Sequence, residues 1–114
     1  MKSFYEKHFK AKAGEKYHNP NKNFTSYFLS FDKGCRLGLM NKVEIPENKN
    51  NDTTGYVGII HFAISVGSTE KVDELTEELK RNNIKVVDEP RYTGDGYYES
   101  VVLDPENNRI EITV

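Results

Sequence analysis

The sequence has almost no cysteine and no long apolar run, and each absence excludes a class of protein. Cys35 is the only cysteine among 114 residues, so neither an internal disulfide framework nor a cysteine-rich zinc site can form. We expect Cys35 to be a small buried apolar residue. No stretch approaches the roughly 20 apolar residues of a membrane span, and the initial segment MKSFYEKHFKAKA has no apolar signal core. These features predict a cytoplasmic protein without a membrane partner.

An excess of charge of one sign is also missing. The chain has 16 Lys and Arg against 18 Asp and Glu, a formal net charge of -2, whereas a nucleic-acid binder needs a basic surface. Hydrophobic residues make up only 36%, but aromatic residues reach 11%, which favours a folded domain with a polar surface over disorder. The length fits a single domain, residues 1–114, with no nucleic-acid partner.

A polar segment divides this domain into two modules. Residues 41–55, NKVEIPENKNNDTTG, are rich in Asn, Lys, Thr and Asp and contain Pro46, a composition typical of a surface linker. We therefore predict module one at residues 1–42, a linker at 43–55 and module two at 56–114.

Module two has the pattern of a strand, a helix and three further strands. The run YVGIIHFAISV, residues 56–66, is short, apolar and β-branched, so we expect a buried strand. Ser68 or Thr69 can cap a helix that ends near Asn82, with Val72, Leu75 and Leu79 as its apolar stripe. The remaining strands are expected at IKVVDEP, stopped by Pro90, at residues 97–104 and, after the turn PENN, at residues 109–114.

Module one repeats this pattern without the opening strand. A helix is expected from Met1 to about residue 12, with Met1, Phe4, Tyr5, His8 and Phe9 on one face, before an irregular segment with room for a short edge strand. Strands are expected at residues 24–32 and 36–40. The end of the module, SFDKGCRLGLM, aligns with VLDPENNRIEIT, which indicates an internal duplication. The predicted fold class is α+β, with two tandem βαβββ modules of which the first lacks its opening strand.

The paired modules, the strand HFAIS and the closing LDPENNRIEI resemble the vicinal oxygen chelate superfamily, which includes glyoxalase I, bleomycin-resistance proteins and extradiol dioxygenases. In glyoxalase-like members, each module offers one metal ligand from its opening strand and one from its closing strand. The resemblance implies His61 and Glu111 as metal ligands in module two. In module one the opening strand is absent, and the closing-strand position falls on Gly38, which has no donor atom.

Two ligands make a weak site, because a catalytic metal usually needs three. Imidazole and carboxylate suit Zn, Ni, Fe or Mn, so we expect a divalent metal that binds weakly or is absent. Glu111 alternates with Ile110 and Ile112, which puts it on the opposite face of its strand, and as a carboxylate ligand it is also the candidate catalytic group that moves a proton. The other histidines, His8 and His18, show no ligand spacing.

Three further residues are candidates for substrate binding. Arg91 has the geometry to hold an anionic group with two hydrogen bonds. Tyr98 and Glu99 are neighbours in a strand and point to opposite faces, and the sequence does not show which face is inward.

Three hypotheses follow for the function. The first is a glyoxalase-I-like, metal-dependent lyase with an impaired metal site that acts on a small oxygen-rich substrate. The second is a metal-free protein that binds or sequesters a small molecule, which the glycine at position 38 favours. The third is that a start upstream of Met1 supplies the missing strand and ligand. Because an unpaired strand edge tends to be covered, we also expect a homodimer.

Overall fold

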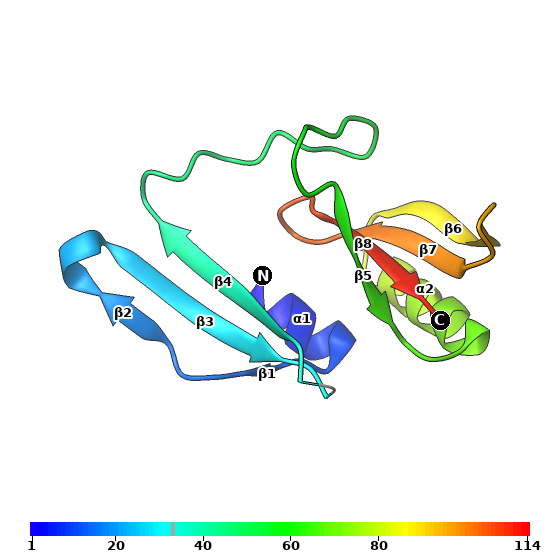
Figure 1. Ribbon diagram of the computed structural model, residues 1–114, viewed down its shortest axis with the longest axis horizontal. Coiled ribbons are helices and arrows are strands. Elements are labelled where there is room, and N and C mark those ends of the chain that lie inside the picture. Colours follow the sequence, from blue (N-terminus) through cyan, green and yellow to red (C-terminus); the bar gives the residue numbers. More distant parts are fainter. Residues whose placement is uncertain (33) are drawn as a thin grey trace. The chain divides into compact units, whose positions relative to one another are not determined.

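The computed structural model describes residues 1–32 and 34–114, which form two compact units, Met1–Asn48 and Lys49–Val114 (Figure 1). The boundary between the units lies within the segment that we predicted as a linker. Each unit has its own sheet of four strands and its own α-helix.

The second unit contains β5 (His61–Ser65), α2 (Thr69–Arg81), β6 (Val86–Tyr92), β7 (Tyr98–Leu103) and β8 (Arg109–Thr113). The strand order in its sheet is β5-β8-β7-β6, and β5 runs parallel to β8 whereas the other pairs are antiparallel. The predicted order of a strand, a helix and three strands is confirmed.

Helix α2 begins and ends as the sequence indicates. The Ser68 hydroxyl accepts a hydrogen bond of 3.4 Å from the backbone N–H of Lys71 and so caps the helix. The buried stripe differs by one residue from the prediction: Thr76 is fully buried beside Val72 and Leu79, whereas Leu75 is only half-buried. Burial of Thr76 is tolerated because its hydroxyl bonds the Val72 carbonyl at 2.6 Å and the Ser100 hydroxyl at 2.7 Å.

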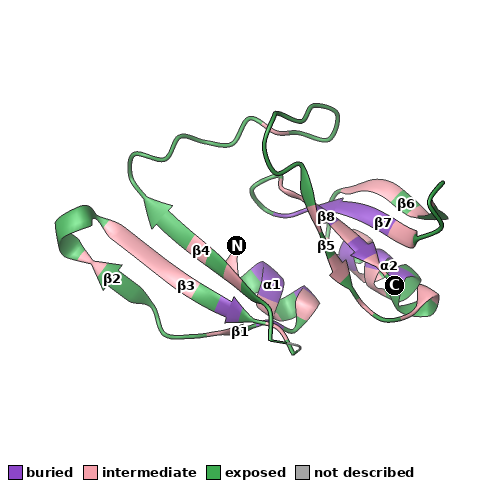
Figure 2. Cartoon of the chain, viewed as in Figure 1, coloured by how far each residue is buried: buried purple, intermediate pink, exposed green. Residues whose placement is uncertain are grey.

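The core of this unit lies between α2 and one face of the sheet. Helix α2 packs against β6, β7 and β8, and the buried residues of this unit concentrate on α2, β7 and β8 (Figure 2). Ile110 and Ile112 of β8 are fully buried, and Glu111 between them points to the other face, as strand alternation requires.

A polar turn joins β7 to β8. The Asp104 side chain, which is 3% exposed, accepts hydrogen bonds of 2.9 Å from the backbone N–H groups of Glu106 and Asn108. The Asn108 amide adds two more bonds to the same carboxylate. This network explains why the DPENN sequence forms a tight turn there.

The first unit contains α1 (Lys2–Phe9), β1 (Lys12–Ala13), β2 (Tyr17–Asn19), the 3-10 helix η1 (Pro20–Lys22), β3 (Phe24–Ser30) and β4 (Arg36–Lys42). Strands β1 and β2 pair with successive parts of β3, and β4 pairs with the whole of β3, so β4 lies on the opposite side of β3. Helix α1 ends earlier than predicted because Lys10 adopts a left-handed conformation with φ 55°. The buried residues of α1 are Phe4, Tyr5 and His8.

Three local predictions are wrong. Cys35 is exposed because it lies in the turn between β3 and β4. The buried strand predicted at residues 56–66 begins only at His61. Residues 56–60 before it are exposed and include Gly58 at φ +139°. Pro90 does not stop β6, because the pairing of β6 with β7 is irregular between Asp88 and Arg91, where proline's missing N–H is tolerated.

Candidate functional site

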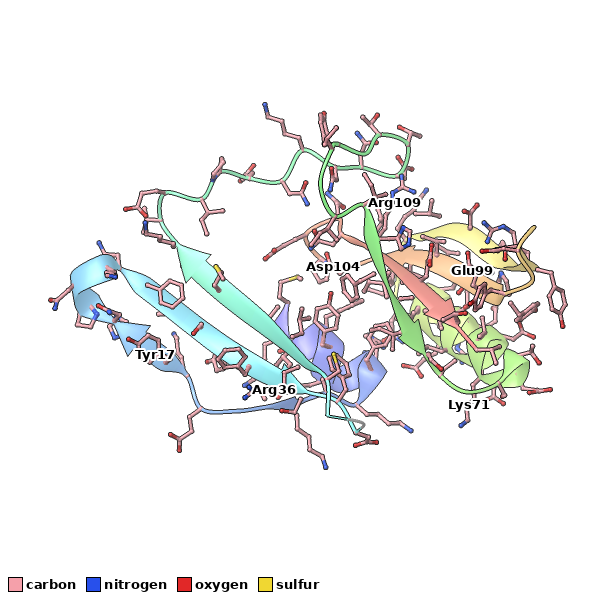
Figure 3. The ribbon with its side chains drawn as sticks, viewed as in Figure 1. Tyr17, Arg36, Lys71, Glu99, Asp104 and Arg109 are labelled. Carbon is pink, nitrogen blue, oxygen red and sulfur yellow. The ribbon has the colours of Figure 1, made fainter. Side chains whose placement is uncertain are left out.

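The face of the second sheet that lies away from α2 carries a row of polar side chains. Glu111 of β8 stands opposite Ala63 of β5 and Val101 of β7, so these residues share one face. Residues two positions along each strand lie on the same face, which adds His61 from β5. The same alternation adds Glu99 from β7 (Figure 3). The structure therefore brings together residues that lie 50 positions apart in the sequence.

His61 and Glu111 are in direct contact. The His61 Nε2 atom lies 3.2 Å from the Glu111 Oε1 atom, and the side chains are 47% and 21% exposed. β5 and β8 are neighbouring parallel strands, in which His61 is paired with Arg109 and Ala63 with Glu111. His61 and Glu111 are therefore diagonal neighbours on one face of the sheet. The predicted ligand pair is therefore assembled on one face and remains accessible to a small molecule.

The separation of this pair fits two ligands of one metal ion. Ligands about 2.1 Å from an ion at a tetrahedral angle lie about 3.4 Å apart, close to the observed distance. In the described part of the chain, however, no three His, Cys, Asp or Glu side chains gather so as to hold a metal ion. The described residues thus supply two candidate ligands and no third.

Glu99 extends the row toward Arg91. The side chain of Glu99 is only 12% exposed, and Arg91 Nη1 lies 3.8 Å from its Oε1 atom. Burial raises the pKa of Glu99, the negative charge of Glu111 raises it further, and Arg91 opposes both effects. Glu99 consequently keeps its proton to a higher pH than an exposed glutamate does.

Arg91 is held by a carboxylate that the sequence analysis missed. Its Nη2 atom lies 3.3 Å from Asp88 Oδ2. Two residues three positions apart in a regular strand point to opposite faces, but the irregular register between them places Asp88 opposite Val101 and Arg91 opposite Glu99. Arg91 therefore contacts two carboxylates, while its side chain remains 45% exposed.

Tyr98 lies apart from these groups. Its hydroxyl donates a hydrogen bond of 2.8 Å to Asp73 Oδ1 of α2, and its ring packs against Tyr92 with the centroids 4.9 Å apart. The hydrogen bond to Asp73 raises the pKa of Tyr98. The Tyr98 side chain therefore points to the face that α2 covers. Glu99, its neighbour in the strand, points to the open face, a choice that the sequence left undecided.

The first unit has no carboxylate at the position equivalent to Glu111. Gly38 stands opposite Phe28 in the β3–β4 pair, as Glu111 stands opposite Val101 in the β7–β8 pair. The Phe28 ring passes close to Gly38, and the Arg36 guanidinium lies 5.0 Å from the centroid of that ring. His8 is buried in α1 and His18 is exposed on β2.

Among the described residues, no helix has the length and apolar character needed to cross a membrane. A search of curated proteins finds no sequence that matches this chain. A family model described as the Glyoxalase/Bleomycin resistance protein/Dioxygenase superfamily matches residues 1–112.

Solved structures share the fold at low sequence identity. The glyoxalase family protein from Enterococcus faecalis has a TM-score of 0.76 at 20% identity, over 99% of this chain and 85% of that chain. A glyoxylase/bleomycin resistance protein/dioxygenase domain from Frankia sp. EAN1pec has a TM-score of 0.80 at 15% identity, over 98% and 84% of the two chains. Glyoxalase I from Zea mays has a TM-score of 0.74 at 23% identity, over 97% of this chain but only 38% of that one.

Proposed function

Because the chain belongs to the glyoxalase/bleomycin resistance protein/dioxygenase superfamily, we propose that it is a glyoxalase-I-like, metal-dependent lyase for a small oxygen-rich substrate. The observation that carries the proposal is the contact of His61 with Glu111 on the open face of the second sheet. An imidazole and a carboxylate at this separation are a donor set for Zn, Ni, Fe or Mn.

Each polar residue of the row has a role in this proposal. His61 and Glu111 would hold the ion, which supplies positive charge that stabilises negative charge developing on adjacent substrate oxygens. Glu111 also moves a proton between substrate atoms, as a carboxylate beside the reacting carbon can. Glu99, half-buried beside Arg91, donates a hydrogen bond to a substrate hydroxyl when it is protonated and accepts one when it is ionised.

The metal site that the described residues supply is incomplete. Two protein ligands fall below the usual three of a catalytic zinc site, so binding is weak and activity is low at ordinary metal concentrations. The position equivalent to Glu111 in the first unit is Gly38, which cannot contribute. We therefore infer an impaired site, in which excess metal restores part of the activity.

A metal-free small-molecule binding protein is the second candidate. It is supported by the direct contact of His61 with Glu111, which satisfies both groups without an ion. In this case the open face binds a polar ligand through hydrogen bonds to Glu111 and Glu99.

Conversion of a hemithioacetal, followed with and without added Zn²⁺ or Ni²⁺, distinguishes the two candidates. The lyase is supported by turnover that rises with metal, falls at least tenfold in Glu111→Gln, and is unchanged in His18→Ala, an exposed histidine outside the row. Turnover at the uncatalysed rate at every metal concentration would contradict the lyase and leave the binding protein as the better account.

We infer in addition that the protein works as a homodimer in the cytoplasm. Members of this superfamily often form dimers, which supports association. The single exposed thiol of Cys35 suits a reducing compartment. Light scattering after size exclusion should give twice the 13.1 kDa mass of one chain.

A further inference from the structure

The first sheet has one face that α1 covers and one face that it leaves uncovered. Leu29 of β3 is fully buried, and the Lys2 ammonium of α1 lies 5.1 Å from the centroid of the Tyr27 ring. Tyr27 and Leu29 therefore mark the face of β3 that α1 covers, because alternate residues of a strand share a face. Phe28, between them, points to the uncovered face and is 55% exposed.

The centre of the uncovered face is apolar. Directly paired residues of antiparallel strands share a face, so Ser26 of β3 lies in one row with Tyr17 of β2 and Met40 of β4. Phe28 lies in the next row, opposite Gly38. Tyr17, Phe28 and Met40 are all more than half exposed. Two neighbouring rows of the sheet therefore present large side chains with apolar surface to the solvent.

One end of the uncovered face is basic. Ser30 of β3 is paired with Lys12 of β1 and with Arg36 of β4, so one cation stands on each side of it. The four strands lie wholly within the described chain and contain no Asp or Glu. In that part of the chain, neither cation is paired with a carboxylate, whereas Lys42 at the other end is paired with Glu44 at 3.4 Å. An anion is therefore attracted to the end that carries Lys12 and Arg36.

Arg36 and Phe28 link the basic end to the apolar centre. The Arg36 guanidinium lies 5.0 Å from the centroid of the Phe28 ring. The ring reaches across to β4, where a Cβ atom on Gly38 would meet the Phe28 Cε1 atom at 3.5 Å. The face thus places guanidinium N–H donors beside an exposed aromatic ring, an arrangement that suits a ligand with an anionic group next to a planar apolar one.

We propose that the uncovered face of the first sheet binds a small aromatic anion. The ring of the ligand packs against the Phe28 ring and the Met40 thioether, both of which form favourable contacts with aromatic groups. Its carboxylate accepts hydrogen bonds from Arg36 and is attracted by Lys12. The proposal uses residues of the first unit alone, so it stands whether or not the second unit binds a metal.

The same face of a second copy is a poorer occupant. Because the strands of this sheet contain no Asp or Glu, a second copy would bury Arg36 and Lys12 without supplying an opposite charge. Burial of an unpaired charge is unfavourable. A free aromatic carboxylate brings the negative charge with it and also covers the exposed Phe28 ring.

The probe is 2-naphthoate, titrated into the full chain without added metal and followed by backbone NMR. We expect saturable shifts at residues 26–30 and 36–40, with a dissociation constant on the order of 0.1–1 mM for a ligand of this size. The neutral compound 2-naphthylmethanol has the same ring system and should bind at least fivefold more weakly, because it cannot form the charge-assisted bonds to Arg36.

Substitutions on the face separate the two parts of the ligand. Arg36→Gln should reduce binding of 2-naphthoate to the level of 2-naphthylmethanol, and Phe28→Thr should weaken binding of both compounds at least fivefold. The matched controls, Arg81→Gln on α2 and Tyr92→Thr on β6, remove an exposed cation and an exposed aromatic ring outside this face and should leave binding unchanged. If Phe28→Thr does not fold, Met40→Thr tests the apolar centre in its place.

Four results would overturn the proposal. No saturable shift up to about 5 mM 2-naphthoate would show that the face binds no such ligand. Equal binding of the two naphthyl compounds would show apolar contact without recognition of the anion. Shifts at residues 61–65 and 109–113 that disappear in Arg91→Gln would place the anion in the second unit. A dimer that dissociates in Phe28→Thr, with no response of the native chain to 2-naphthoate, would show that a second copy covers the face.

Discussion

Gly38 in β4 and Glu111 in β8 occupy equivalent positions in two equivalent strand pairs. Gly38 is paired with Phe28 of β3 and Glu111 with Val101 of β7, in the same antiparallel register. The second unit thus carries a metal-type donor where the first carries none. In the first unit an aromatic ring and the Arg36 guanidinium lie next to this position instead.

The native chain should bind Zn²⁺ or Ni²⁺ with a dissociation constant above about 1 µM, because two ligands fall short of the usual three. Titration calorimetry measures this value directly. His61→Ala should abolish the heat of binding, and His18→Ala should leave it unchanged. Submicromolar binding of one ion per chain would show that a third ligand exists and that the count of two is wrong.

Replacement of Gly38 by alanine should stabilise the protein by about 0.5–1 kcal/mol, since glycine in a strand costs conformational entropy. A Cβ atom at this position meets the Phe28 Cε1 atom at 3.5 Å, an ordinary contact. The matched control is Gly34→Ala, which should be destabilising because Gly34 has φ +85°. Urea denaturation of both variants gives the comparison, and a loss of stability in Gly38→Ala would mean that Phe28 cannot adjust.

The raised pKa of Glu99 predicts a specific pH dependence. A carboxyl whose pKa is higher in the folded protein than in the unfolded chain favours folding while protonated, and this contribution is lost as pH rises through the folded-state value. Glu99→Gln should therefore gain stability relative to wild type at pH 7, with a smaller difference at pH 4. Urea midpoints at the two pH values give the sign.

Glu77 provides a control of opposite sign for this test. A hydrogen bond from Lys80 lowers the pKa of Glu77, so its contribution is present above the unfolded-state pKa and is lost as pH falls. Glu77→Gln should accordingly lose stability relative to wild type at pH 7 and approach wild type in acid. The same pH trend in both variants would mean that the environment of Glu99 is not the cause.

The buried hydroxyl pair of Thr76 and Ser100 predicts an asymmetric double-mutant cycle. The Thr76 hydroxyl donates its one proton to the Val72 carbonyl, so the Ser100 hydroxyl is the donor in the 2.7 Å contact between them. Thr76→Val leaves a buried donor without its acceptor and should cost about 1–3 kcal/mol. Ser100→Ala removes only the donor and should cost about 0.5–1.5 kcal/mol.

The double variant should cost less than the sum of the two single changes, because it removes both polar partners together. Strict additivity in chemical denaturation would show that the two hydroxyls do not interact.

Patterns local to one segment were enough to predict most elements. Ser68 followed by acidic residues and an apolar stripe set the bounds of α2, and the alternation of Ile110, Glu111 and Ile112 placed Glu111 on the open face. The internal repeat put Gly38 at the position of Glu111, and the strand registers agree. These inferences succeeded because side-chain periodicity and capping depend on near neighbours in the chain.

Features that depend on distant partners were decided by the tertiary structure. Asp88 and Arg91 share a face only because β6 pairs irregularly with β7, and Thr76 is buried in place of Leu75 because Ser100 lies opposite it. The sequence by itself determined the order of elements and the residues that alternate across each strand. The tertiary structure decided which face each strand turns to α2 and which side chains meet on the open face, because strand pairing and helix packing select among patterns that are locally equivalent.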